Sequence, residues 1–121
     1  MPVRHYIDSR QRCIFLTFSG FLTEWEIGVG VQALWHDPEY KPEFDRFIDV
    51  YGVEGSDAGD EFVKVLAKDT SIPRTGRMAL FGKEAQVIGF REVFAPNASG
   101  LDCRAFLDSA EALDWLGVQA P

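Results

Sequence analysis

Residues 46–59, RFIDVYGVEGSDAG, decide the fold predicted for this chain. Phe47, Ile48 and Val50 form a short apolar run, which is typical of a strand buried in an α/β sheet. Asp49 interrupts this run near the expected carboxyl end of the strand. The pattern therefore predicts a central buried strand whose end carries a carboxylate.

A polar turn is expected to follow this strand. It contains Gly52, Gly55, Ser56 and Asp57, and a helical pattern begins at Asp60. In open α/β sheets, ligands and partners bind beyond the carboxyl ends of the strands. The turn with Gly55, Ser56 and Asp57, together with Asp49, is therefore the first candidate for a partner or ligand surface.

The residues before this strand predict a hairpin and a helix. Two strands, at 3–8 and 13–19, are separated by a short polar link, which favours an antiparallel hairpin. Thr23 and Glu26 have the spacing of a capping box at a helix start. This helix is expected to end near His36, because the Asp-Pro pair that follows cannot continue it.

The residues after the turn predict alternating helices and strands. A helix at 60–69 is expected to place Phe62, Val65 and Leu66 on its inner face. The later elements are a strand at 77–81, a helix at 83–95, a strand at 102–106 and a helix that Asp108 caps and Gly117 ends. The prediction is a single α/β domain over 1–117, with a frayed tail at 118–121. It has a five-stranded mixed, mostly parallel sheet, an N-terminal β-hairpin and four helices.

Composition and charge limit the function classes. The chain has 121 residues, 46% hydrophobic residues, 10 Phe, 3 Tyr and 3 Trp, enough for a core of its own. Its formal net charge of −7 argues against binding to nucleic acid or to an anionic membrane. The sequence has no apolar run long enough for a membrane span, and no signal peptide is expected. Cys13 and Cys103 are read as buried, reduced thiols, so the expected location is the cytoplasm.

Three segments carry a likeness to a known family. They are FSGFLTEWE at 18–26, FDRFIDVYGVEG at 44–55 and AFLDSAEALDWLG at 105–117. In this order and spacing the chain resembles the SpoIIAA-like family of small STAS-like proteins. The STAS fold is that of bacterial anti-sigma-factor antagonists, and the family is similar in shape to CRAL-TRIO lipid-binding domains. Most members of the family have no defined activity, so the resemblance implies a fold rather than a reaction.

The chain departs from anti-sigma antagonists at one position. Those proteins carry Asp-Ser-Ser-Gly after the central strand, and the first serine is phosphorylated. The corresponding residues here are Asp57, Ala58 and Gly59, so alanine stands where the phosphate acceptor would be. Ser56 lies two residues earlier, in a different register. A phosphate-switched antagonist is therefore not expected.

The chemistry-bearing residues do not form a catalytic signature. Asp49, Asp57 and Asp60 either form a catalytic or metal-binding carboxylate group or have structural roles. The structural reading is favoured: Asp49 bonds the turn, and Asp57 or Ser56 caps the next helix.

Other candidate sites are also read as structural. Neither His5 nor His36 has a further ligand at metal spacing, and Cys13 is read as a core thiol. Gly82-Lys83 lacks the flanking glycines of a phosphate-binding loop. No cofactor and no metal is expected.

Two helices show surplus apolar residues. Trp25 and Val29 lie off the buried stripe of the first helix, and Phe90 and Phe94 flank Arg91 on the third. Exposed apolar patches with tryptophan and arginine are typical of partner surfaces. The leading hypothesis is therefore a non-enzymatic module that binds an unknown protein partner and forms a homodimer. The alternative is a carrier of a small apolar or acyl ligand, suggested by the many phenylalanines and the likeness to CRAL-TRIO domains. An enzyme ranks third.

Overall fold

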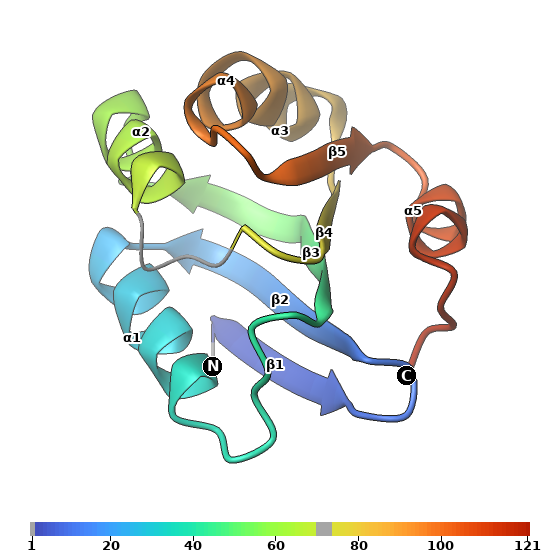
Figure 1. Ribbon diagram of the computed structural model, residues 1–121. Coiled ribbons are helices and arrows are strands. Elements are labelled where there is room, and N and C mark those ends of the chain that lie inside the picture. Colours follow the sequence, from blue (N-terminus) through green and yellow to red (C-terminus); the bar gives the residue numbers. More distant parts are fainter. Residues whose placement is uncertain (1, 70–73) are drawn as a thin grey trace.

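The structure is a computed structural model that describes residues 2–69 and 74–121, and its strands form one sheet (Figure 1). The strand order is β1-β2-β3-β4-β5, with β1 and β2 antiparallel and all other neighbours parallel. The strands are β1 (Val3–Asp8), β2 (Cys13–Leu22), β3 (Asp45–Ser56), β4 (Arg77–Phe81) and β5 (Asp102–Phe106). The predicted five-stranded mixed sheet with an N-terminal hairpin is confirmed.

The helices divide unequally between the two faces of the sheet. They are α1 (Glu24–Trp35), α2 (Asp60–Lys68), α3 (Glu84–Gly89), the π-helical turn η1 (Phe90–Phe94), α4 (Ala95–Asn97) and α5 (Ser109–Leu116). α1, α2 and the α3–η1–α4 stretch cover one face, and α5 covers part of the other (Figure 1). Consecutive parallel neighbours with right-handed crossovers place the connecting helices on one face, which explains the imbalance.

The predicted turn after the central strand is wrong, because β3 continues to Ser56. Its polar end pairs with residues 19–22 of β2, which also extends beyond its predicted end at Ser19. The register shifts twice along this pairing, so the glycines lie at bulges rather than in a turn. A Cβ on Gly55 would lie only 3.1 Å from the ring of Phe21. A side chain at this position would therefore require the exposed ring of Phe21 to shift by a few tenths of an ångström.

The third predicted helix is longer and less regular than expected. Helical residues run from Glu84 to Asn97, through Pro96 and two residues beyond the predicted end of the helix at residue 95. Proline lacks an N–H and its ring clashes with the carbonyl four residues earlier. The backbone hydrogen-bond pattern of the helix changes before Pro96. The N–H of Ala95 donates to the carbonyl of Phe90, five residues back, instead of four. The π-helical turn thus accommodates the proline.

α1 begins as its capping box predicts and ends at Trp35, one residue before His36. Glu26 N–H donates to Thr23 Oγ1 at 3.1 Å, and Thr23 N–H donates to the Glu26 carboxylate at 3.2 Å. Ile27 and Leu34 form its buried face. This end of the fold is therefore fixed by local sequence chemistry.

Two glycines in α1 have opposite roles. A Cβ on Gly30 would collide with the side chain of Val3 in β1, whereas a Cβ on Gly28 meets nothing within 4 Å. We expect Gly30→Ala to lower the free energy of unfolding by about 1–3 kcal/mol, the usual cost of overpacking. Gly28→Ala, the matched control, should raise it by about 0.5–1 kcal/mol through helix propensity. Urea unfolding of both variants tests this, and equal gains in both would contradict the close α1–β1 packing.

Candidate functional site

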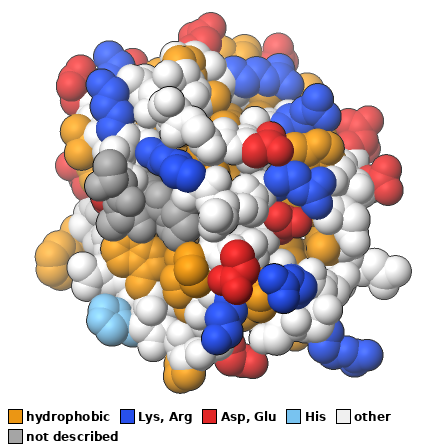
Figure 2. Space-filling model, in the orientation of Figure 1, with side chains coloured by type: hydrophobic (Ala, Val, Ile, Leu, Met, Phe, Trp, Pro, Cys, Tyr) orange, Lys and Arg blue, Asp and Glu red, His pale blue; other side chains and the backbone are white. Residues whose placement is uncertain are grey.

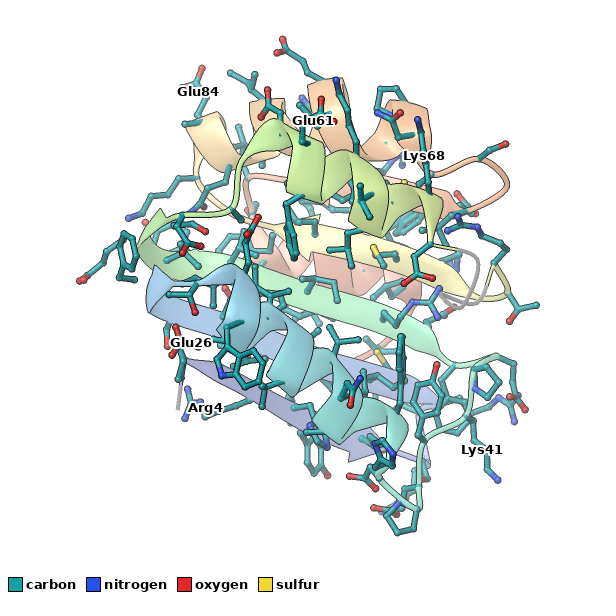
Figure 3. All side chains as sticks on the ribbon, turned by 90° about the vertical axis from the view of Figure 1, so that its left-hand side faces the viewer. Arg4, Glu26, Lys41, Glu61, Lys68 and Glu84 are labelled. Carbon is teal, nitrogen blue, oxygen red and sulfur yellow. The ribbon has the colours of Figure 1, made fainter. Side chains whose placement is uncertain are left out.

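An apolar cleft lies on the helix-covered face, with a volume of about 430 Å³. Its floor is formed by β2, β3 and β4, and α1, α2 and η1 form its walls (Figure 3). Its lining residues include Ile48 and Leu80 on the floor, Val31 on α1, Val63 and Leu66 on α2, and Phe90 and Phe94 on η1. Ligand pockets are typically of this size and predominantly apolar.

The wall formed by α2 corrects a predicted helix face. Val63 and Leu66 line the cleft and Phe62 is partly buried, but Val65 is 68% exposed, so its predicted inward position is wrong. Successive residues of a helix turn by about 100°, and the face centred on Val63 and Leu66 leaves Val65 outside. α2 therefore offers one valine to the cleft and one to solvent.

The wall formed by η1 carries two predicted ligand-surface residues. Phe90 and Phe94 are stacked, with ring centroids 4.9 Å apart, and both line the cleft. Each is less than a tenth exposed, so they belong to an interior surface rather than to an outer patch. Between them Arg91 is exposed and donates to the carbonyl of Ala105 at 3.3 Å. The structure thus separates Arg91 from the two rings.

A glutamine that sequence analysis did not single out joins α3 to β3 at the cleft. Gln86 Nε2 donates to the carbonyl of Val50 at 2.9 Å and to that of Val53 at 3.4 Å. Its Oε1 accepts from the N–H of Lys83 at 2.6 Å. One side chain therefore satisfies a helix start and a bulged strand, a role that no local pattern reveals.

Arg46 is the one charged residue among the described residues that line the cleft, and it too was not singled out from the sequence. It is only 6% exposed, and its guanidinium donates from Nη2 to the carbonyl of Thr75 at 3.1 Å. Desolvation by burial lowers the pKa of Arg46 from its usual value. A guanidinium stays protonated in proteins, so the cleft wall carries a positive charge.

The polar end of β3 has structural contacts rather than a shared site. Asp57 Oδ1 accepts from the N–H of Glu24 at 2.8 Å and thereby helps to cap α1. Ser56 Oγ accepts from the N–H of Ala58 at 3.0 Å, and the N-cap of α2 is Gly59, with no side-chain hydrogen bond to cap the helix. The predicted capping of the second helix by Asp57 or Ser56 is therefore wrong. Among the candidates in this stretch, Ser56 lines the cleft.

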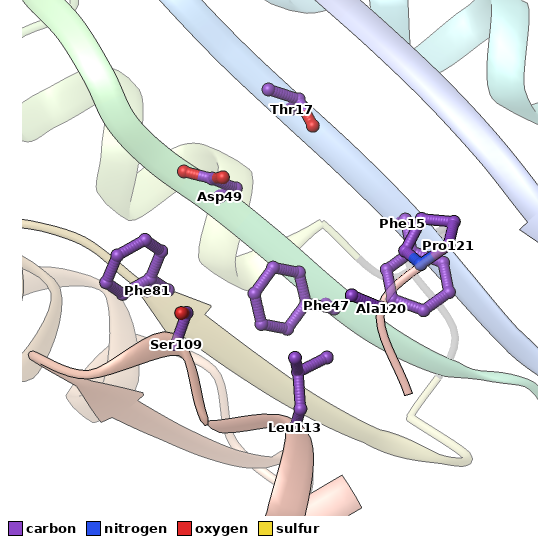
Figure 4. Close-up of a pocket in the computed structure, with 9 residues that line it drawn as sticks. All are labelled: Phe15, Thr17, Phe47, Asp49, Phe81, Ser109, Leu113, Ala120 and Pro121. Carbon is purple, nitrogen blue, oxygen red and sulfur yellow. The ribbon is translucent and has the colours of Figure 1, made fainter. Parts of the chain in front are cut away.

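Asp49 lies on the opposite face of the sheet, in a smaller pocket of about 290 Å³ (Figure 4). The rings of Phe15, Phe47 and Phe81 line this pocket with Thr17. The Asp49 carboxylate accepts from the N–H of Tyr51 at 2.9 Å. β-Strand alternation thus separates Asp49 from the residues of the cleft.

Trp25 and Val29 lie outside both pockets. They are 79% and 46% exposed and lie one turn apart on α1. Their expected position off the buried stripe is confirmed. We call this pair the Trp25 patch.

The remaining titratable candidates have identified contacts. His5 Nε2 lies 2.9 Å from the Asp37 carboxylate, and His36 Nδ1 lies 2.8 Å from the carbonyl of Gln32. Burial raises the pKa of the Cys13 thiol to about 12, which makes it a poor nucleophile. Cys103, which was also predicted to be buried, is only partly buried, so that prediction is wrong. Within residues 2–69 and 74–121, no three His, Cys, Asp or Glu side chains are grouped so that they could hold a metal ion.

Charged side chains of both signs are mixed on the face of the molecule that Figure 2 shows. The prediction against nucleic acid remains a prediction. In the part of the chain that the structure describes, no helix combines the length and hydropathy that crossing a membrane requires.

Comparisons with known proteins support the fold. No protein-family model matches the chain, and none of the curated proteins is similar to it. The chain is similar to the crystal structure of an uncharacterized protein from the DUF3478 family with a SpoIIAA-like fold, from Shewanella loihica PV-4. The TM-score is 0.64 and the identity 21%, over 94% of this chain and 93% of the other. The expected SpoIIAA-like fold is therefore confirmed.

Proposed function

We propose that the protein is a non-enzymatic module that carries a small apolar ligand, such as an acyl chain, in the apolar cleft. The observation that carries this proposal is the size and apolar lining of that cleft. Binding would remove the cleft walls from water, at about 25 cal/mol per Å² of apolar surface buried. Polar groups among its lining residues, Tyr40 and Ser56, would then orient the ligand.

The positions of the carboxylates favour binding over catalysis. Asp49 faces the smaller pocket on the other side of the sheet, and Asp57 caps α1. A general acid and base must both reach one reacting group. We therefore propose a carrier rather than an enzyme, and we place it in the cytoplasm, where its two free cysteines, Cys13 and Cys103, would stay reduced.

Native mass spectrometry of protein purified gently from its source cells tests the carrier. We expect a population with added mass of lipid size, which is lost after organic extraction of the denatured protein. Delipidated protein should regain that mass when it is mixed with a long-chain alcohol. A bare chain that takes up neither native lipid nor alcohol would count against the proposal.

A second candidate function, protein docking, rests on the Trp25 patch. A tryptophan that is 79% exposed is unusual for a monomer surface, and tryptophan is enriched at the centres of interfaces. Neither Trp25 nor Val29 lines the cleft, so docking and carrying are separable. The occupant we propose is a second copy of this chain, which would form a homodimer.

Trp25→Lys is expected to convert this dimer into a folded monomer. The exposed position predicts little change in stability, whereas a buried interface would lose its anchor and gain a charge. The control is Val65→Lys, which puts the same charge on an exposed residue of α2. Sedimentation of the three proteins tests this. A dimer that survives Trp25→Lys, or a monomeric wild type, would show that this patch is not a homodimer interface.

A further inference from the structure

The strongest unassigned feature is the smaller pocket, of about 290 Å³, on the sheet face that α5 partly covers (Figure 4). The backbone register pairs Asp49 on β3 with Thr17 on β2 and with Phe81 on β4. Two residues earlier, Phe47 pairs with Phe15 on β2. Residues two apart on a strand share a face of the sheet. The fold therefore places one carboxylate and one hydroxyl next to three aromatic rings.

The aromatic rings form a continuous row on this face. The ring centroids of Phe15 and Phe47 are 5.9 Å apart, and those of Phe47 and Phe81 are 6.5 Å apart. Tyr51 stacks on Phe81 at 5.2 Å, with an angle of 6° between the rings. The faces of aromatic rings are electronegative and attract cations. The row already binds one cation, because the Lys83 ammonium lies 5.1 Å from the centroid of Tyr51.

The polar groups of the pocket are hydrogen-bond acceptors. Asp49 is the one charged side chain among the described residues that line the pocket. Its Oδ1 accepts from the N–H of Tyr51 at 2.9 Å, and its Oδ2 has no partner in the described part of the chain. The hydroxyls of Thr17 and Ser109 likewise have no hydrogen-bond partner among the residues that the structure describes. One carboxylate oxygen and two hydroxyls are therefore available to a ligand that donates hydrogen bonds.

The neighbouring cations leave the Asp49 carboxylate unpaired. Arg4 on β1 is in register with the β2 residue of the pocket, but it is exposed and forms no ion pair with Asp49. Lys83 lies over an aromatic ring, and Arg77 binds a different aspartate and the end of α5. The N-terminus of α5 carries a partial positive charge, which the capping carboxylate of Asp108 offsets. A cation in the pocket would therefore find a carboxylate that no described side chain neutralises.

We infer that this pocket binds a small primary amine, whose ammonium group is held by the Asp49 carboxylate and whose apolar body lies against the rings of Phe47 and Phe81. An alkylammonium stays protonated near neutral pH, as lysine does, and donates three hydrogen bonds. The pocket offers acceptors on Asp49, Thr17 and Ser109. Its volume is close to the lower end of the usual range for ligand sites, which suits a small molecule. The sheet separates it from the apolar cleft, so this inference is independent of the carrier function.

The test compares two probes of the same size, 2-phenylethylamine and 2-phenylethanol, in a titration followed by proton–nitrogen NMR spectra at constant pH and ionic strength. We expect the amine to cause saturable shifts at the amides of Thr17, Tyr51 and Phe81. Its affinity should exceed that of the alcohol at least about tenfold, the usual gain of a charged hydrogen bond. The Tyr51 amide is a direct reporter, because it donates to the carboxylate that would bind the amine.

Three variants assign the preference to individual groups. Asp49→Asn should reduce the affinity for the amine about tenfold and leave that for the alcohol nearly unchanged, and its side-chain oxygen can still accept from Tyr51. Thr17→Val removes a hydroxyl at nearly constant shape and should reduce the affinity for the amine several-fold. The control is Glu61→Gln, which removes the same charge from a 90% exposed side chain on α2, on the other face of the sheet. This control should bind the amine as wild type does.

The contrary outcomes are distinct. Equal affinity of wild-type protein for amine and alcohol, or no saturable binding of either, would overturn the inference. An unchanged preference in Asp49→Asn would show that the ammonium group binds elsewhere. Equal losses in Glu61→Gln and Asp49→Asn would assign the attraction to the net charge of −7. If Asp49→Asn does not keep the dispersed spectrum of a folded protein, the wild-type comparison and Thr17→Val decide.

Discussion

Val63→Trp is expected to reduce binding of a neutral naphthylamine fluorophore about tenfold or more. Val63 lines the apolar cleft from α2, so the indole would occupy the volume that the ligand needs. Overfilling a packed apolar site costs about 1–3 kcal/mol, which corresponds to roughly five- to 150-fold in affinity. Because the indole would enter an existing cleft of about 430 Å³ rather than displace packed side chains, it should leave the free energy of unfolding unchanged or raise it by up to about 1 kcal/mol.

The control is Val65→Trp on the same helix. Its side chain is 68% exposed, and it does not line the cleft. The two variants have the same composition and the same change in helix propensity, so a difference in binding reports the position of the indole. Fluorescence titration and urea unfolding of both proteins provide the measurement. If both lose binding equally, or neither does, the fluorophore does not occupy this cleft.

Local chemistry explains why the first and last residues of some helices and strands were predicted correctly. β1, β4 and β5 have the predicted bounds, and α5 begins after the Asp108 cap and ends before Gly117. Gly117 adopts the left-handed conformation at φ 71° that helix ends require. The residues that set each of these boundaries lie within a few positions of it, so the boundary can be predicted from the sequence alone.

The ends of β2 and β3 depend on each other and could not be predicted in this way. Gly20, Gly52 and Gly55 have the composition of a turn, yet they pair across two register shifts. The pairing satisfies backbone groups that a turn would expose, and it depends on a strand more than 30 residues away along the chain. The role of Asp57 could not be predicted locally either, because it caps α1, a helix that lies more than 20 residues earlier in the chain.

The candidate site was predicted only in part for the same reason. Phe90 and Phe94 were singled out from their spacing, and both reach the cleft. Arg46 was not singled out, because a charged residue is common at the start of a strand, before its apolar run. Its guanidinium is held by the carbonyls of Pro42, before β3, and Thr75, before β4, which lie 33 residues apart in the chain. Such a residue is recognised only when these two segments are in place.

Arg77→Met is expected to lower the free energy of unfolding by about 2–4 kcal/mol, the largest stability effect we predict. Arg77 Nη1 donates to the carbonyl of Trp115 at 2.6 Å, and Nη2 to that of Leu116 at 3.0 Å. These carbonyls end α5 and have no partner within the helix. Nη2 also binds the Asp45 carboxylate at 3.1 Å, so one guanidinium ties a helix end to the sheet.

The rest of the α5 end explains why no other group replaces Arg77. The N–H groups of Gly117 and Val118 donate to the carbonyls of Asp114 and Leu113, which completes the usual C-terminal motif. That motif leaves the last two carbonyls of the helix to the guanidinium. A positive charge is also favourable at a helix C-terminus. Methionine keeps the apolar stem but provides neither donors nor charge.

Arg104→Met is the matched control for Arg77→Met. Both guanidiniums lie over the ring of Trp115, Arg77 at 5.2 Å and Arg104 at 5.6 Å from its centroid. Losing a surface cation–π contact costs about 0.5–1 kcal/mol, so Arg104→Met should be much milder. Urea unfolding of both variants measures the difference, and equal losses would assign the effect to the ring rather than to the helix end. Because α5 and the apolar cleft lie on opposite faces of the sheet, folded Arg77→Met should bind the fluorophore as wild type does, whereas Val63→Trp should not.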